Sequence, residues 1–489
     1  MKKQKTIAFL LCLIIVSILS GCAGHKKSLG QFDAKYVNGL YAESTQLALE
    51  KQKSLLGKQG SGNLLWTLQA AASSRAASDY EISSELFDQC EAIMKKYDEE
   101  GTLKEATNYA AQIAVNDAVL DYRGQVYDGV MVNTYKALNF MSTGQPDYVR
   151  IEMNRADDRQ RRAVEYFAKE IQSRNEAVEK KKEENEKRGV FLEKALTNPD
   201  LQTSITNKYP ELEQWETYPD FVNPFTTYMQ GLFLFLGGED LQDLSKARDS
   251  FRRVVGMTRN PFVGEDLAVL DSVLAAKISR DALPATVWVV FENGLGPVKD
   301  ERRIDIPMFF EKIKYVGIAL PSLCFRDSAF STLHVSDGIN TLSATRTLAS
   351  MDRVVQSEFK KEFSGIVTRA VLSTALKSYV QYEAGREYGD LGSLVAGLYQ
   401  VATTQADVRN WTALPKEFQL ARFERPANGI LSFRAPEAGT SEILSVNLPN
   451  AQFAIVYVKV PSAMAPAVGH VISFGREMFV HVDKGDISN

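Results

Sequence analysis

Cysteine and histidine are scarce in this chain, which has four of each among 489 residues. The histidines are His25, His334, His470 and His481, and none lies in a His-x-x-x-His or Glu-x-x-His arrangement. The spacing therefore predicts neither a metal site nor a general base. A Gly-x-Ser-x-Gly turn, which would mark a serine nucleophile, is also missing. We expect no catalytic residue, no metal and no cofactor.

The chain also lacks an excess of basic residues. Its formal net charge is -4, and it becomes more negative when Lys2, Lys3 and Lys5 are removed with the segment described next. A nucleic-acid partner would demand a basic footprint, so we expect none. The apolar content of 45% is ordinary for a folded globular protein.

The one long apolar run lies at the N-terminus. Residues 1–5 are basic, residues 7–19 are apolar, and Ser20 and Gly21 are small. This pattern is typical of a secretion signal. The apolar run is shorter than the roughly 20 residues that a membrane span needs. We therefore predict a cleaved signal peptide over residues 1–21.

Leu19-Ser20-Gly21-Cys22 resembles the bacterial lipoprotein signal, in which the cysteine becomes the new N-terminus. The resemblance implies that Cys22 carries a thioether-linked diacylglycerol and an N-acyl chain. Such lipid would hold the protein in a membrane leaflet without a spanning helix. The next residue is Ala23, not the Asp associated with inner-membrane retention. By resemblance to sorted lipoproteins, we expect anchoring at the periplasmic face of the outer membrane.

The length predicts two or three domains. We expect an α+β multidomain protein with a lipidated N-terminus and tether over residues 22–62, a helical-repeat domain over 63–280 and an α+β domain over 281–489. Residues 32–49 are predicted to form a tether helix that spaces the body from the bilayer, because this part is polar and is followed by the flexible run 57–62. Cys90 and Cys324 then fall in separate domains, which favours two buried free thiols over a disulfide.

Three helix pairs are predicted between residues 63 and 280, from small and aromatic residues three or four apart. They turn near residues 78–79, 143–146 and 237–238, and Asn260-Pro261 is expected to end the last helix. Ala247, Phe251 and Pro261 resemble part of the tetratricopeptide signature. A tetratricopeptide-like array and an irregular helical bundle both remain open. Either presents a concave face, which usually binds protein.

The pattern changes to that of strands near residue 284. Residues 286–291 form a β-branched and aromatic run typical of a strand buried on both faces. A turn at 292–297, a strand at 315–321, a helix at 353–382 and a further helix at 394–401 are expected next. Short strands then return at residues 419–423, 430–433, 442–446, 453–460 and 471–479. We predict a mostly antiparallel sheet.

Several motifs of the C-terminal half occur in a characteristic order, at residues 290–299, 304–307, 317–321, 367–370 and 407–415. In this combination they resemble a family of uncharacterised lipoproteins of Gram-negative bacteria with a repeat-rich N-terminal half. The resemblance implies location and architecture and no established reaction.

Candidate partner-binding residues are few. They are the aromatic residues Trp66, Tyr135 and Tyr228 of the helix pairs, together with Asp407, Arg409 and Trp411. The last three admit two interpretations. They form a recognition point for a protein or glycan, or an Asp–Arg pair with Trp411 as a lid that fixes the chain before the next strand. We favour the structural interpretation.

The main hypothesis is a non-enzymatic scaffold or adaptor that binds an envelope protein through its helical repeats. A narrower version, supported by architecture alone, is a regulator of peptidoglycan synthesis. One alternative is a wall- or polysaccharide-processing enzyme with a site at Glu292, Asp305 or Asp407. Another is a subunit of a secretion or surface-appendage machine. In the structural interpretation, Glu292 pins the turn at 292–297 by hydrogen bonds.

Overall fold

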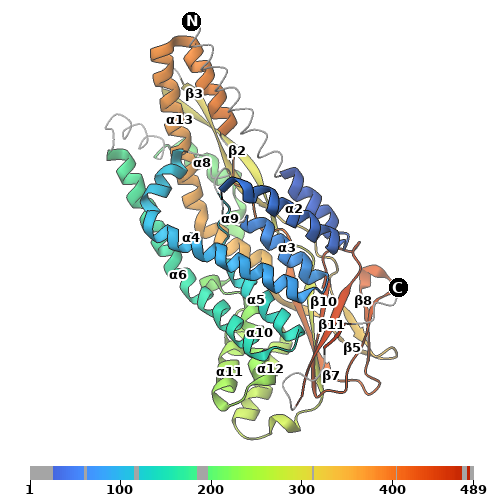
Figure 1. Ribbon diagram of the computed structural model, residues 1–489. Coiled ribbons are helices and arrows are strands. Elements are labelled where there is room, and N and C mark those ends of the chain that lie inside the picture. Colours follow the sequence, from blue (N-terminus) through green and yellow to red (C-terminus); the bar gives the residue numbers. More distant parts are fainter. Residues whose placement is uncertain are drawn as a thin grey trace.

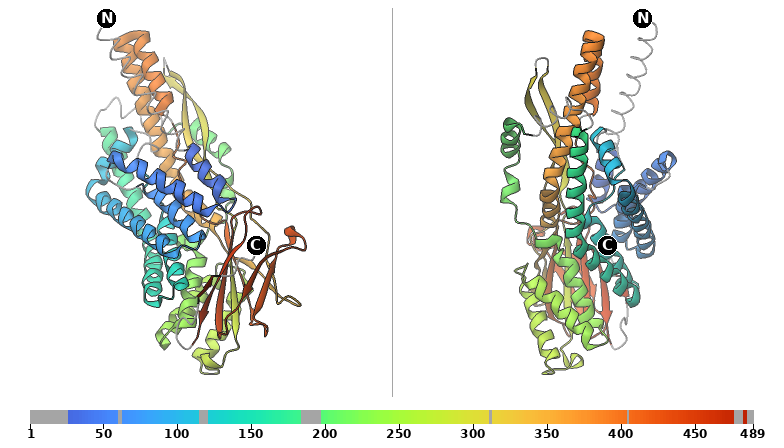
Figure 2. Two further views of the ribbon diagram at one scale, coloured as in Figure 1. Left: turned by 45° about the vertical axis from the view of Figure 1, so that its right-hand side comes forward. Right: turned by 90° about the vertical axis from the view of Figure 1, so that its left-hand side faces the viewer.

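A layer of helices packs on one face of a six-stranded sheet, and a four-stranded sheet covers the opposite face (Figures 1 and 2). The computed structural model describes residues 26–59, 63–114, 121–183, 197–310, 313–403, 405–475 and 482–484. The predicted α+β class is confirmed, and most of the helices precede the first strand in the chain. Within these ranges, every helix is too short or too polar to cross a membrane.

The first helices form the layer drawn in blue and cyan in Figure 1. Residues 26–36 are helical, and the elements that follow are α2 (Tyr41–Gln59), α3 (Leu64–Ala76), α4 (Tyr80–Ala114), α5 (Val126–Ser142) and α6 (Pro146–Glu183). The pairs α3–α4 and α5–α6 match two predicted pairs, with turns at the predicted positions. The two helices of a pair differ in length, 13 and 35 residues in the first and 17 and 38 in the second. The structure thus shows helix pairs without a constant repeat unit.

Shorter helices connect this layer to the sheet. They are α8 (Pro199–Lys208), α9 (Glu211–Gln214), η2 (Pro219–Phe221), α10 (Pro224–Gly237), α11 (Leu241–Val255), α12 (Pro261–Leu274) and η3 (Arg280–Ala282). The prediction that Asn260-Pro261 ends a helix is wrong. Asn260 caps α12, because its side chain accepts a hydrogen bond from the Phe262 amide, and Pro261 is the first helical residue. Proline is favoured there because that position needs no amide donor.

The six-stranded sheet has the order β12-β11-β10-β1-β7-β6. Its strands are β1 (Thr286–Asn293), β6 (Arg346–Ser350), β7 (Glu417–Glu424), β10 (Phe453–Val460), β11 (Val468–Phe474) and β12 (Val482–Lys484). Among these, β1 and β10 run parallel and the other neighbours are antiparallel. The predicted strand at 471–479 lies in β11 only as far as Phe474, and residues 476–479 lie outside the described part.

Alternation along β1 divides the apolar residues between two cores. Trp288 and Val290 face the helices, whereas Val287 and Val289 face the four-stranded sheet. That second sheet has the order β5-β4-β8-β9, with β4 (His334–Ser336), β5 (Thr341–Ala344), β8 (Ile430–Arg434) and β9 (Glu442–Asn447). Every residue of β1 is buried, so the prediction of a strand covered on both faces is confirmed.

A hairpin and a long helix complete the fold. β2 (Val298–Phe310) pairs antiparallel with β3 (Ile313–Cys324), and α13 runs from Met351 to Thr403. Both extend beyond the sheets at one end of the molecule (Figure 1). The sequence predicted two separate helices over part of α13 and missed β2 as a strand.

The helical and sheet halves share one hydrophobic core, which contains residues from Phe32 to Phe474. This core crosses the expected domain boundary at 280/281. It also includes Phe32 and Tyr36, both essentially without solvent exposure. Residues 32–49 are therefore part of the folded body, and the interpretation of this stretch as a free tether helix is corrected. Phe32, for example, packs on Trp66, a contact between distant segments that the local sequence does not reveal.

Candidate functional site

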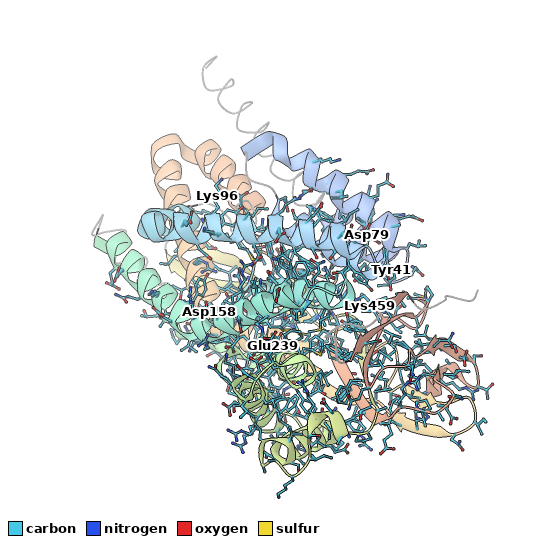
Figure 3. All side chains as sticks on the ribbon, turned by 60° about the horizontal axis from the view of Figure 1, so that its bottom comes forward. Tyr41, Asp79, Lys96, Asp158, Glu239 and Lys459 are labelled. Carbon is cyan, nitrogen blue, oxygen red and sulfur yellow. The ribbon has the colours of Figure 1, made fainter. Side chains whose placement is uncertain are left out.

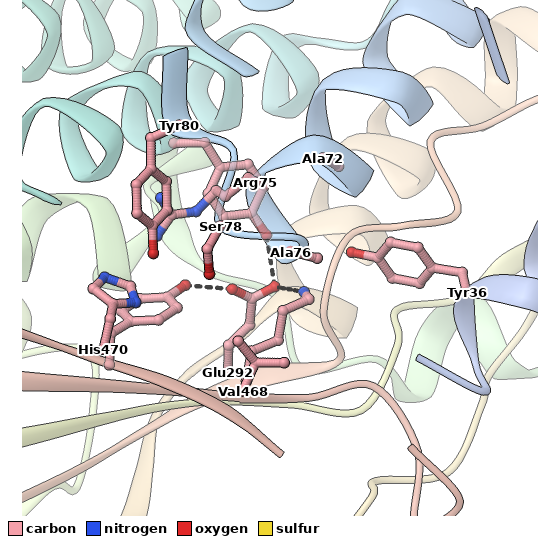
Figure 4. A pocket seen from close by; sticks show the side chains of 12 residues that line it. Tyr36, Ala72, Arg75, Ala76, Ser78, Tyr80, Glu292, Val468 and His470 are labelled. Carbon is pink, nitrogen blue, oxygen red and sulfur yellow. Dashed lines mark hydrogen bonds and ion pairs between the residues drawn. The ribbon is translucent and has the colours of Figure 1, made fainter. Parts of the chain in front are cut away.

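A small polar pocket lies where the helical layer meets the six-stranded sheet (Figure 4). It is formed by the segment before α2, the α3–α4 turn, α5 and the strands β1, β10 and β11. Figure 3 shows this junction from below, with Tyr41 and Lys459 labelled close together. The residues that line the pocket are Tyr36, Ala72, Arg75, Ala76, Ser78, Tyr80, Tyr135, Glu292, Tyr457, Lys459, Val468 and His470.

Strand register places the polar side chains of the sheet. Tyr457 and Lys459 are two residues apart on β10 and therefore point to the same face. In the register, Lys459 is the neighbour of Glu292 on β1, and Tyr457 is the neighbour of His470 on β11. These four residues make a polar square on the face that the helices cover. The helices must supply its remaining hydrogen bonds, because water is largely excluded.

Glu292 is the centre of this square. Its Oε1 accepts hydrogen bonds from Lys459 Nζ and from the Tyr135 hydroxyl, the latter at 3.0 Å, and its Oε2 accepts from the Tyr457 hydroxyl. Burial alone would raise the pKa of Glu292. The positive charge of Lys459 and the hydrogen bonds from Lys459 and Tyr457 outweigh burial, so that this pKa lies below its ordinary value. Glu292 is thus an ionised acceptor with both oxygens occupied, and it cannot act as a general acid at neutral pH.

The prediction that Glu292 pins the turn after β1 is wrong. Asn293 does so: its Oδ1 accepts from the amides of Ala329 and Phe330, and its Nδ2 donates to the Phe330 carbonyl at 2.7 Å. The turn itself needs Gly294, whose φ is +63°. The two neighbours point to opposite faces of β1, so the alternation decides which of them reaches the turn.

Arg75 brings a second positive charge into the pocket. Its side chain extends from α3, and the guanidinium carbon lies 5.7, 5.4 and 5.0 Å from the centroids of the Tyr80, Tyr135 and Tyr457 rings. Nη1 donates to Asn139 Oδ1 at 2.6 Å. Nη2 is buried and has no hydrogen-bond partner among the described residues. Arg75 and Lys459 together exceed the charge of Glu292 by one.

His470 closes the pocket on the sheet side. Its ring stacks on Tyr457 with 5.3 Å between centroids, and its Nε2 lies 2.9 Å from Ser142 Oγ. Burial, assisted by the positive charge of Arg75, lowers the pKa of His470 to about 3. The Ser142 hydroxyl donates its proton to the Leu138 carbonyl at 2.9 Å. His470 therefore donates to Ser142 and does not act as its base, so the pair is not arranged as an activated nucleophile.

Asp407 and Arg409 form the predicted pair, with Arg409 Nε 2.8 Å from Asp407 Oδ1. Burial alone would raise the pKa of Asp407, but the charge and hydrogen bonds of Arg409 lower it. Neither residue lines the pocket, and both lie on the segment that leads to β7. The side chain of Asp305, the third acid of the enzyme alternative, lies outside the described residues. Among the described residues, no group of His, Cys, Asp and Glu could hold a metal ion.

The predicted aromatic binding residues are in the core. Trp66, Tyr135, Tyr228 and Trp411 are each at most 2% exposed. Trp411 packs against Tyr135 with 5.9 Å between ring centroids, and the Tyr228 hydroxyl donates to Asp266 at 2.7 Å. A partner docked on the protein surface could not reach these rings, each of which is at most 2% exposed. The helix face that was expected to bind a partner is covered by the chain's own sheet.

The lipidation cysteine Cys22 and the cleavage residues Leu19, Ser20 and Gly21 lie outside the described residues, so their roles stay predictions. Cys90 and Cys324 are both free thiols. Cys90 is buried as expected, whereas Cys324 is exposed at the end of β3.

Sequence reasoning missed Arg75 and Lys459 as site residues and set His470 aside. One signal was available: Tyr457 and Lys459 interrupt the apolar strand 453–460 with period two, which marks a polar position on a buried face.

Comparison of the chain with protein-family models finds no match, and comparisons with the curated proteins and with the solved structures find none either.

Proposed function

We propose that this chain is a lipid-anchored lipoprotein of the bacterial cell envelope that works as a non-enzymatic adaptor. The observation that carries this proposal is the run Leu19-Ser20-Gly21-Cys22, which follows a basic segment and a short apolar one. Ala23 supports the periplasmic face of the outer membrane as the location. The relation to the Gram-negative lipoprotein family, the tetratricopeptide-like character of the helix pairs and a role in regulating peptidoglycan synthesis belong to the same proposal.

The short distance between Cys22 and the folded body sharpens the proposal. The first described helix begins at residue 26, and its Phe32 is fully buried. Four residues span at most about 14 Å. A lipid on Cys22 would therefore hold the body against the membrane surface, and any reach into the periplasm would come from the length of the body. Confinement to one membrane face raises the effective concentration of the protein for other envelope components.

The surface for a partner is proposed on the outer side of the helical layer, since the inner side packs on the sheet. Large apolar side chains are exposed there on α4 and α6, namely Ile82, Tyr148, Ile151, Val164 and Tyr166. Exposed aromatic and aliphatic residues of this kind are the usual anchors of protein interfaces. On the other side of the six-stranded sheet, the β4–β5 turn carries Ile339, which is 88% exposed and serves as a matched control.

The anchor is tested by metabolic labelling with a palmitate analogue and by membrane fractionation. We expect Cys22→Ala to lose the label and to leave the membrane fraction with its fold intact. Cys324→Ala, which removes the exposed thiol, should keep the label. Ala23→Asp should move the labelled protein to the inner membrane. A labelled, membrane-bound Cys22→Ala protein would remove the basis of the proposal.

The adaptor role is tested by photocrosslinking in living cells. A benzophenone amino acid is placed at Tyr148 or Ile151 on α6, and at Ile339 as the control. We expect one or a few reproducible envelope proteins from the α6 positions and none of them from Ile339. Identical products from both faces, or no product from α6, would refute an adaptor that uses this surface.

A further inference from the structure

We propose that the pocket at the helix–sheet junction binds a carboxylate group of a ligand through Arg75. The inference goes beyond the proposed function and does not depend on the lipid anchor or on an adaptor role. It rests on the geometry around Arg75, Glu292 and Lys459, on an unpartnered guanidinium nitrogen and on the place where the pocket opens.

The first step is the balance of charge. The two oxygens of Glu292 are occupied by Lys459 and by two tyrosine hydroxyls, so the carboxylate of Glu292 compensates Lys459. Arg75 is only 6% exposed; it directly contacts Asn139 and three aromatic rings, and at longer range it shares the negative charge of Glu292 with Lys459. Two buried cations that share a single anion are only partly compensated. The pocket is therefore one negative charge short.

The second step is the unpartnered donor. Arg75 Nη2 and the Tyr36 hydroxyl are both buried, and neither has a hydrogen-bond partner among the residues that the structure describes. Both residues line the pocket, and Figure 4 shows the Tyr36 hydroxyl directed into it. A buried N–H or O–H that lacks an acceptor is costly. An acceptor placed in the pocket would satisfy the guanidinium.

The third step concerns the class of anion. Guanidinium pairs best with planar carboxylates and with phosphates, which it binds with two parallel hydrogen bonds. A carboxylate carries one negative charge and would balance the pocket. A phosphate monoester carries about two at neutral pH, which would leave an uncompensated charge beside Glu292. The small size of the pocket and its tyrosine walls also favour the smaller group.

The last step is access. Ser78, in the tight turn between α3 and α4, and Val468, at the start of β11, are both partly exposed and line the pocket. Ser78 has a φ of +62°, a conformation that a residue with a Cβ rarely adopts. Such strain clusters at ligand sites. The carboxylate would enter here, either on a small organic acid or at the C-terminus of a peptide.

The test is isothermal titration of the full-length chain in detergent micelles at pH 7.5 and constant ionic strength. The probes are acetate, N-acetyl-Ala-Ala, the amide of the same dipeptide, and inorganic phosphate, with chloride as background. We expect a carboxylate probe to bind and the amide and phosphate to bind at least about tenfold more weakly. Binding of acetate alone points to a small acid as the ligand, and tighter binding of the dipeptide points to a peptide C-terminus.

Variants assign the binding to this pocket. Arg75→Gln should weaken carboxylate binding at least about tenfold. Arg326→Gln, which removes a partly buried guanidinium that donates to the Gly296 and Thr412 carbonyls, should leave carboxylate binding unchanged. If Arg75→Gln does not fold, Arg75→Lys decides, because it keeps the charge and loses the two parallel hydrogen bonds. Carboxylates that bind no better than chloride, or a folded Arg75 variant of unchanged affinity, would overturn the proposal and leave a water-filled cavity.

Discussion

His470 should make the stability of this protein sensitive to acid. The ring is buried between Tyr80 and Tyr457, and its pKa is lowered to about 3 by burial and by the charge of Arg75. In the unfolded chain the pKa of a histidine is about 6.5. Between these values the unfolded state binds a proton that the folded state does not bind. Stability is therefore complete above about pH 6.5 and is lost as the pH falls toward 3.

The size of the effect follows from this linkage. Protonation of His470 in the unfolded chain lowers the free energy of unfolding by about 0.1 kcal/mol at pH 7.5 and by about 2 kcal/mol at pH 5. Burial also raises the pKa values of Asp128 and Asp266 to about 6. These two carboxyl groups bind protons more readily in the folded state, so a fall in pH makes their contribution to stability more favourable, opposite to that of His470. These two groups stay in place when His470 is replaced. Their effects cancel when the change in stability with pH is compared between the two proteins.

The assay is urea denaturation of the unaltered chain and of His470→Gln at pH 7.5 and pH 5. The substitution has a constant packing cost, which also cancels in the comparison. We expect the variant to lose about 2 kcal/mol less than the unaltered chain between the two pH values. His334→Gln is the control, because solvent reaches the His334 side chain in the folded and unfolded states alike. Equal losses in His470→Gln and the unaltered chain would refute the reasoning.

Three further substitutions test the fold. Phe32→Ala should lower the free energy of unfolding by about 3–5 kcal/mol, since Phe32 is fully buried; an unchanged urea midpoint would mean that the first helix is a detachable tether after all. Gly294→Ala should cost more than Gly338→Ala in the same measurement. Both glycines have positive φ, which alone costs about 1–2 kcal/mol, but only at Gly294 would a Cβ lie 3.0 Å from backbone atoms; equal losses would contradict this. Lys136→Met should cost about 3–5 kcal/mol, because its buried ammonium pairs with three carboxylates; a variant of unchanged or higher stability would show that the network is dispensable.

Much of the secondary structure follows from patterns that are local in sequence. The helix pairs α3–α4 and α5–α6 and the strands β1, β7 and β10 lie where periodicity placed them, because alternation and 3.6-residue spacing are set by neighbours on the same element. The error at Asn260 has a local cause of another kind. An Asn-Pro pair is compatible with the end of one helix and with the start of the next.

The candidate site could not be assembled in this way. Arg75 and Lys459 are far apart in the chain, and the register of β1 with β10 alone brings Lys459 beside Glu292. In the sequence, nothing distinguishes either of them from an ordinary charged residue. The burial of Phe32 is likewise not predictable from its neighbours in sequence, because it depends on contacts with distant segments such as Trp66, 6.4 Å away between ring centroids.

The sequence by itself determined the types and order of most elements, the strand buried on both faces, and the N-terminal run on which the proposed lipid anchor depends. Only the tertiary structure decided which face of the helical layer is covered, that residues 32–49 belong to the body, and that Arg75 and Lys459 lie in one pocket with a single carboxylate, Glu292. The physical reason is the range of the interactions. Periodicity and turn chemistry act over a few residues, whereas burial and charge pairing depend on segments that meet only when the chain has folded.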